Sequence, residues 1–340
     1  MWYLRGSAPG YVPGDGLSAV GISSTECVPF LALFLHQMSD LLTRTRLRRA
    51  FACFLPLLLT CLRPASLSNQ NSTDPIHLSA GQGQVYPGDI VRIDIAAQNV
   101  ERLDLAFIGR KVTVRSKANS GTWQALVGID LETKPGLYAL TGTATLPNGQ
   151  SINLEKSIRI LPKKFPVQRI TVDEKYVTLD PEDAKRAAEE SQKLGALWGT
   201  ITPNKLWQGQ FLYPVSSTLT SGFGRRRIVN DQPRSPHSGV DLKASTGTPI
   251  QAANVGHVVL AEDLFFSGNT VVLDHGLGLY TYYAHCSRIL VTTGETVKKG
   301  QVIAEVGASG RVTGPHLHWA CRLSQARVNP LALAEKWMAE

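Results

Sequence analysis

The feature that most limits the fold of this chain is the repeated succession of short alternating apolar segments and turn residues. Between residues 76 and 161, such segments follow turn signals like Pro87-Gly88-Asp89 and Pro147-Asn148-Gly149. From Trp207 onward the same pattern returns, with glycine as the usual turn residue. Alternation with a period of two is typical of strands that have one buried face. The sequence therefore predicts a mainly β protein with two β regions.

The two β regions predict different architectures. In residues 69–162 the regular spacing of short strands favours an immunoglobulin-like β-sandwich. That region has a single histidine, at its start, and no cluster of acids, so we expect it to position or bind rather than to catalyse. Residues 206–340 predict an antiparallel β-sheet domain, dense in turns, with the candidate chemistry on its strands. Residues 163–205 predict a linker that contains a helix over about 181–197. Asp180 as the N-cap and Pro181 at the first helical position indicate where this helix begins.

The first 68 residues predict a targeting segment rather than a folded domain. TRTRLRR supplies a positively charged stretch, AFACFLPLLLTCL supplies an apolar stretch, and a small-x-small cleavage site follows. We expect residues 38–68 to be a signal peptide and residues 1–37 to be a mis-assigned extension that precedes the true start. The prediction is a chain exported to the periplasm or cell envelope. Lipoprotein anchoring at Cys61 is the alternative, although the threonine before it fits that motif poorly.

Composition limits the kinds of partner. A chain of 340 residues with 43% hydrophobic content can bury enough core for two modest domains. Part of its formal net charge of +8 lies in the predicted signal. Because no basic helix or interleaved aromatic pattern is present, we expect no nucleic-acid partner. The remaining charge favours at most a weak attraction to an anionic polymer such as the bacterial cell wall.

The strongest chemical signal is a pair of histidine motifs. His316 and His318 stand two apart after a Gly-Pro turn, so on a strand both rings project from one face. His237 and Asp241 stand four apart and face the same way in an extended segment. Two imidazoles and a carboxylate around an open position suit a catalytic zinc. His285 is the fourth histidine that could share this groove.

Cys286 and Cys321 are the two cysteines that follow the predicted signal. On strands, both thiols would face away from the neighbouring histidines, which makes them poor metal ligands. Two alternatives are open: a disulfide between them, which export permits, or two buried thiols that act as small apolar groups.

Six motifs, in this order, resemble those of the LytM/lysostaphin-type zinc metallopeptidases, a murein endopeptidase family: GFGRRR, HSGVD, GTPI, DHGLG, YYAH and GRVTGPHLHW. The resemblance covers the second β region. It implies one zinc ion per chain, held by His237, Asp241 and His318. It also implies that His285 and His316 are the catalytic pair. The first β region resembles, more loosely, an N-terminal module of some bacterial envelope members.

The chain departs from the family pattern at Cys286, where leucine is usual, and at Cys321. Neither departure touches an implied ligand. Tyr283 and Thr313 are candidate hydrogen-bond donors beside the site, with ordinary strand and turn roles as the alternative. His257 and His275 fit structural roles.

The resemblance implies an exported zinc-dependent endopeptidase that hydrolyses peptide cross-links of bacterial peptidoglycan, with its peptide stems as substrate. Two alternatives stay open: a catalytically silent wall-binding scaffold or activator of another wall hydrolase, and an exported peptidase that acts on proteins. A regulatory envelope protein is a candidate partner, and the oligomeric state is left open. The segment from Lys163 to Lys205 could lie across the groove and block it.

Overall fold

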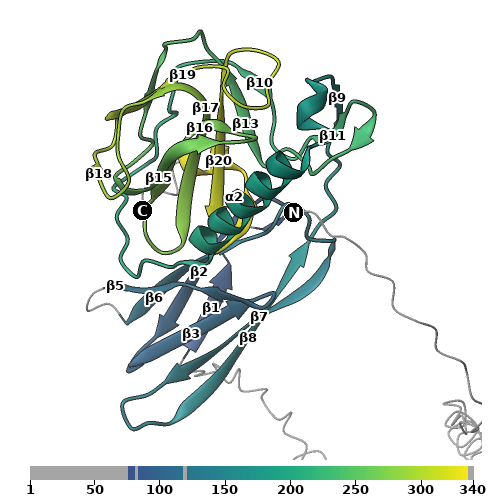
Figure 1. Cartoon of the computed structure of the whole chain (residues 1–340). Coiled ribbons are helices and arrows are strands. Elements are labelled where there is room, and N and C mark those ends of the chain that lie inside the picture. Colours follow the sequence, from purple (N-terminus) through teal and green to yellow (C-terminus); the bar gives the residue numbers. More distant parts are fainter. Residues whose placement is uncertain (1–75, 81–82, 118–120, 336–340) are drawn as a thin grey trace, which may run out of the picture. The chain divides into compact units, whose positions relative to one another are not determined.

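The computed structural model describes residues 76–80, 83–117 and 121–335, which belong to one compact unit. The predicted N-terminal extension, the signal peptide and Cys61 lie outside these residues. Within the described part, no helix has the length and apolar character needed to cross a membrane. The described residues are mainly β, as predicted (Figure 1).

Two antiparallel four-stranded sheets make up the first β region. One sheet contains, in spatial order, β1 (Ile76–Ala80), β2 (Ile90–Ala97), β6 (Thr122–Gly128) and β5 (Val114–Lys117). The other contains β4 (Arg110–Val112), β3 (Arg102–Phe107), β7 (Gly136–Thr145) and β8 (Ser151–Ile160). Side chains from both sheets form a single hydrophobic core, which includes Ile93, Phe107 and Ile158. Its immunoglobulin-like character stays a prediction.

The segment between the two β regions contains β9 (Val167–Ile170), the short 3₁₀ helix η1 (Glu174–Tyr176) and α2 (Pro181–Gly199). The predicted helix is therefore present and extends two residues further. Asp180 caps it, because its carboxylate accepts a hydrogen bond from the backbone N–H of Asp183. Ion pairs between Arg186 and Asp263 and between Lys193 and Glu262 then hold α2 against the second β region.

The second β region is built on a ten-stranded sheet. Its main path runs β10 (Leu219–Ser221), β13 (Gly239–Lys243), β20 (His316–Leu323), β17 (Leu279–Ile289), β16 (Gly268–Asp274), β15 (Gly256–Leu264) and β18 (Thr296–Val297). Three more strands attach to this path: β14 (Pro249–Gln251), β19 (Val302–Val306) and β21 (Ala326–Val328). A three-stranded sheet beside it joins β12 (Gln232–Pro233), β11 (Arg226–Val229) and β9. The 3₁₀ helix η2 (Pro330–Ala334) follows the last strand.

Alternation along β20 separates the core from the candidate site. Leu317, Trp319 and Cys321 are fully buried in the main core of this region. His316 and His318 project from the opposite face. The large apolar residues on one face thus fix the register that presents the histidines on the other.

The first β region contacts the second through a buried ion pair. Arg327 donates to Asp130 through its backbone N–H and its guanidinium, with a shortest distance of 2.6 Å. Burial would raise the pKa of Asp130, but the Arg327 bonds lower it to about 2. Gly128 lies in the same contact, where a Cβ would come within 3.0 Å of Ala326. Small side chains and a charge pair therefore join the two regions closely.

Candidate metal centre

Strand pairing brings the two histidine motifs together. β13 and β20 run antiparallel, with Asp241 opposite His318 and Lys243 opposite His316. Directly opposed residues on paired strands share a face. The side chain of Asp241 is therefore fixed beside that of His318, and His237 joins them from the irregular segment just before β13.

A glycine permits the close approach of these strands. A Cβ on Gly239 would lie 2.5 Å from the carbonyl oxygen of Trp319 and 2.8 Å from the His318 ring. No side chain larger than a hydrogen atom fits there without moving the strands apart. Gly239, the glycine of the HSGVD motif, thus allows β13 and β20 to approach closely enough to bring Asp241 beside His318.

Three ligand atoms from these residues form an almost equilateral triangle. Nε2 of His237, Nδ1 of His318 and Oδ1 of Asp241 are each 2.9 Å from the other two. The corners of such a triangle lie about 1.7 Å from its centre, so bonds of ~2.0–2.1 Å to one ion can be made from just outside its plane. Within the described residues, these three side chains are the group that could hold a metal ion.

The protonation of His237 also favours a cation. Its Nδ1 lies 3.1 Å from the carbonyl oxygen of Gly222, to which it donates, so the lone pair is on Nε2 and points into the triangle. Burial lowers the pKa of His237, and that of His318 to about 4, so both rings are neutral at pH 7. Burial would raise the pKa of Asp241, but the two histidines beside it hold that pKa far below its usual range. Lone pairs and a carboxylate this close repel one another unless a cation lies among them.

His316 and His285 lie next to the triangle. His316 Nδ1 donates to the carbonyl of Gly314 at 2.8 Å, and His285 Nδ1 donates to that of Ser309 at 3.0 Å. In both rings Nε2 is therefore left as the free basic nitrogen. The centres of the two rings are 5.0 Å apart, and His316 Nε2 is 3.7 Å from Asp241. All five predicted site residues thus lie in one cluster.

His285 reaches the site only because β17 is irregular there. Ala284 lies opposite His318, so regular alternation would turn His285 toward the core. The ladder shifts register at this point, and His285 has a φ of +66°, which is unusual for a residue with a side chain. The bulge rotates the ring into the site. Burial, followed by the charges of the neighbouring histidines, then lowers the pKa of His285 to about 3.

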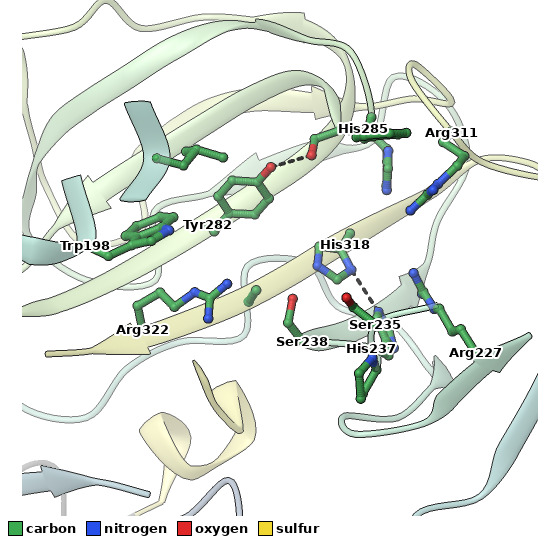
Figure 2. Close-up of a pocket in the computed structure, with 15 residues that line it drawn as sticks. Trp198, Arg227, Ser235, His237, Ser238, Tyr282, His285, Arg311, His318 and Arg322 are labelled. Carbon is green, nitrogen blue, oxygen red and sulfur yellow. Dashed lines mark hydrogen bonds between the residues drawn. The ribbon is translucent and has the colours of Figure 1, made fainter. Parts of the chain in front are cut away.

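The same irregularity decides which tyrosine lies at the site. Tyr283 is not beside the metal group: it lies opposite Trp319 in the core, and its hydroxyl accepts from the backbone N–H of Ala253. Tyr282 lies on the site face instead, with its ring centre 6.2 Å from that of His318. Its hydroxyl donates to Ser267 (Figure 2). Of the two roles predicted for Tyr283, hydrogen-bond donor beside the site or ordinary strand residue, the structure therefore supports the second.

Other candidates have structural roles. His275 is fully buried and bonds to Val255 and Thr281, and His257 bonds to Thr296. Cys286 and Cys321 are free, buried thiols, which is the second of the two alternatives. Burial raises the pKa of Cys286 to about 12, so this thiol stays protonated.

A pocket opens over the metal group. Its lining includes both histidines of the metal group and His285. The other lining residues come from α2, from β11, β17 and β20, and from the neighbouring loops: Leu194, Trp198, Arg227, Ser235, Pro236, Ser238, Phe266, Ser267, Tyr282, Arg311, Ala320 and Arg322. Figure 2 shows Arg227 and Arg311 at one end and Trp198 and Arg322 at the other. Arg227 and Arg311 belong to the motifs GFGRRR and GRVTGPHLHW, yet their charge did not enter the sequence prediction. The run of arginines in GFGRRR and the single arginine before the histidines of GRVTGPHLHW were the signals that could have revealed them.

Known proteins match part of the chain. The sequence model of Peptidase family M23 matches residues 235–330. The peptidoglycan DD-endopeptidase ShyA of Vibrio cholerae is 40% identical over 122 residues, which is 35% of this chain and 28% of that protein. The DD-carboxypeptidase/endopeptidase Mpg of Neisseria meningitidis is 37% identical over 120 residues, with the same coverage of 35% and 28%. The matches thus span just over a quarter of the length of these relatives.

A solved structure matches most of the described chain. The putative peptidase M23 from Pseudomonas aeruginosa is 32% identical, with a TM-score of 0.59, and the match covers 74% of this chain and 96% of that one. The metal-ligating group described above lies inside the segment that the family model matches. The chain therefore belongs to peptidase family M23.

Proposed function

We propose that this chain is an exported, zinc-dependent endopeptidase that hydrolyses peptide cross-links of bacterial peptidoglycan. The observation that carries the proposal is the triangle of two neutral imidazoles and one carboxylate, all 2.9 Å apart. The similarity of the chain to peptidoglycan DD-endopeptidases supports the substrate class. Membership in a peptidase family supports amide hydrolysis as the reaction.

The donor set fits zinc. His237, His318 and Asp241 supply two nitrogens and one oxygen, which is the ligand set of catalytic zinc sites that keep a position open for water. Zinc bound there would lower the pKa of a water molecule to ~7 and so make hydroxide available at neutral pH. Softer metals prefer thiolates, and both thiols of this region are buried in the core. One zinc ion per chain is therefore the proposed cofactor.

His316 and His285 are proposed as the catalytic pair. Each ring is oriented by a hydrogen bond from Nδ1 to a backbone carbonyl, which leaves Nε2 as the base. From this position a ring can remove a proton from the attacking water and return it to the leaving amine. A protonated ring can also stabilise the oxyanion of the tetrahedral intermediate. The low pKa of His285 favours its neutral form at the start of the cycle.

The regions that precede the peptidase domain are proposed to determine where the protein acts. We propose that residues 69–162 form an immunoglobulin-like domain that localises or regulates the peptidase of residues 206–340. The two sheets with a shared core support this domain. Export to the periplasm or cell envelope, through a signal at residues 38–68, would place the chain beside its substrate.

The linker, residues 163–205, is proposed to limit access to the groove. Leu194 and Trp198 of α2 line one end of the pocket, and no residue of this segment belongs to the metal group. A chain that begins near Lys205 should therefore digest cell wall faster than the full chain. Equal rates would remove this part of the proposal.

Digestion of purified cell-wall sacculi tests the function directly. The mature protein should release cross-linked peptide fragments, and a chelator should stop the release until zinc is added back. Mass spectrometry of the fragments identifies the broken bond. If the protein binds zinc but leaves sacculi and synthetic cross-linked peptides intact, the chain is not a wall peptidase. That result would support the alternative of a catalytically silent scaffold or activator of another wall hydrolase.

A further inference from the structure

The pocket beside the metal group carries positive charge that no carboxylate in its own lining balances. Three arginines line it, and its lining includes no aspartate or glutamate. Arg311 has no carboxylate partner anywhere in the described part of the chain. Its guanidinium lies over the ring of Phe266, 4.5 Å from the ring centre. Arg322 is at the far end, where it lies over the Trp198 ring at 5.6 Å.

Arg227 lies at the same end of the pocket as Arg311 (Figure 2). One of its nitrogens is 3.4 Å from Asp241, a long contact, and its Nε is buried with no hydrogen-bond partner among the described residues. A buried donor without an acceptor is costly, so an acceptor from outside the protein is expected there. If Asp241 binds a cation, the negative charge of its carboxylate is shared with that ion. The positive charge of Arg227 is then balanced even less.

The position of Arg311 is fixed before any ligand arrives. Its backbone N–H donates to the carbonyl of Phe266 at 2.8 Å, so the main chain and the guanidinium are both anchored on that residue. The preceding Gly310 has a φ of +73°, and a Cβ there would lie 2.4 Å from the backbone of Gly268. Burial, and repulsion by Arg227 and Arg234, lower the pKa of Arg311 to about 10, yet it remains charged at neutral pH. The structure thus holds like charges together, which an anionic ligand would relieve.

We infer that Arg311 and Arg227 form a binding site for a free carboxylate of the substrate, located beside the bond that is cut. The inference rests on the proposed function and deepens it, because it names a chemical requirement of the substrate. The planar guanidinium fork matches a carboxylate in two parallel hydrogen bonds. An acidic group on the peptide flanking the scissile amide would then place that amide over the metal group. Peptides in which this carboxylate is absent or amidated are poor substrates.

Two synthetic cross-linked peptides, identical except that the flanking carboxylate is free in one and amidated in the other, test the inference. The unaltered protein should cleave the free form with a kcat/KM about 10 to 100 times higher, as expected for a charge-assisted hydrogen bond. Arg311→Gln should reduce that ratio to within about threefold, with zinc content unchanged. Arg311→Lys should give an intermediate ratio, because it keeps the charge and loses the fork.

Arg226→Gln is the matched control. Arg226 is the exposed neighbour of Arg227 on β11, and alternation turns its side chain away from the pocket. This variant should keep the full preference for the free carboxylate. A preference that survives in Arg311→Gln, or that is absent in the unaltered protein, would overturn the inference.

Binding separates this inference from the proposed function. Isothermal titration of the zinc-loaded His285→Ala protein with the same two peptides measures recognition without turnover. Tighter binding of the free carboxylate, lost in an additional Arg311→Gln, supports the anion site even if no peptide is cleaved. Equal binding of the two peptides rejects the site, whether or not the protein is a peptidase.

Discussion

The two β regions have similar sequence patterns but bury different side chains. Between residues 83 and 161, Asp130 is the single buried polar side chain among those described, and its bonds go to Arg327 of the other region. The second region buries nine polar side chains, among them His237 and Asp241 of the metal group. Because an unpaired buried polar group is costly, such residues persist where hydrogen bonds or a ligand compensate them. Burial of polar residues, rather than strand pattern, therefore distinguishes the region with a chemical site.

The largest predicted effect comes from breaking the triangle. His318→Ala removes one of three ligand atoms and should abolish stoichiometric zinc binding. Because a metal ion supplies several kcal/mol of transition-state stabilisation, kcat/KM on wall peptides should fall at least about 1,000-fold. Metal content by mass spectrometry and turnover of sacculi measure the two effects. Turnover close to that of the unaltered protein would refute the ligand assignment.

A smaller effect is expected beside the triangle. His316→Ala leaves all three ligand atoms in place, so zinc content should stay near one per chain. Loss of a proton-transfer group should lower kcat about 100- to 10,000-fold. His257→Ala, at a histidine outside the site, is the control and should change neither quantity. Loss of zinc from His316→Ala would place this ring among the ligands.

The buried His275 of the second region predicts a stability that depends on pH between about pH 4 and 6.5. Burial lowers its pKa to about 4, whereas the unfolded chain recovers the ordinary value of 6.5. Between these values the unfolded state binds the extra proton, so stability falls as pH falls from about 6.5 to about 4. The loss at the low end is up to about 3 kcal/mol. Urea unfolding of the full chain and of His275→Asn at a series of pH values isolates this contribution as their difference.

The His275→Asn comparison has a clear contrary outcome. Asparagine does not titrate but can donate as the His275 ring does to the carbonyl of Val255. The variant should lose less stability than the unaltered chain on acidification. Parallel stability curves for the two proteins would contradict a neutral His275 in the folded state.

The smallest predicted effect concerns the contact between the two regions. Asp130→Asn removes one charge of a largely buried pair and should lower the free energy of unfolding by about 1–3 kcal/mol. Glu132→Gln is the matched control, because Glu132 also bonds to Arg327 but is 59% exposed. It should cost at most about 0.5–1 kcal/mol. Equal effects of the two variants in urea unfolding would show that burial does not strengthen the Asp130 bond.

That the candidate ligands share one face could be predicted because they lie on regular strands, whereas the choice of His318 rather than His316 as a ligand came from the family resemblance. His316 and His318 share a face by alternation alone, and the spacing of His237 and Asp241 suits an extended segment. The helix after Asp180 could also be predicted from neighbouring residues, because its N-cap and its first-turn proline are adjacent in the sequence. Such features depend on near neighbours in the chain and can be recognised in a sequence.

The rest depended on irregular backbone and on distant contacts. The sequence prediction named Tyr283, two residues before His285, as a candidate beside the site, and regular alternation would put these two side chains on one face. The positive φ at His285 breaks that alternation, and nothing in the local sequence announces a bulge there. The approach of Arg227 to Arg311 depends on β11 joining the small sheet with β9, a long-range pairing that strand patterns do not specify.

The central claim is that three side chains of the second region meet around one zinc ion. Anomalous X-ray diffraction at the zinc edge, on crystals of the mature protein, tests it most directly. The account predicts one zinc per chain, bonded to Nε2 of His237, Oδ1 of Asp241 and Nδ1 of His318 at ~2.0–2.2 Å. Zinc located at other residues, or no zinc at this site in crystals grown with excess zinc, would contradict it.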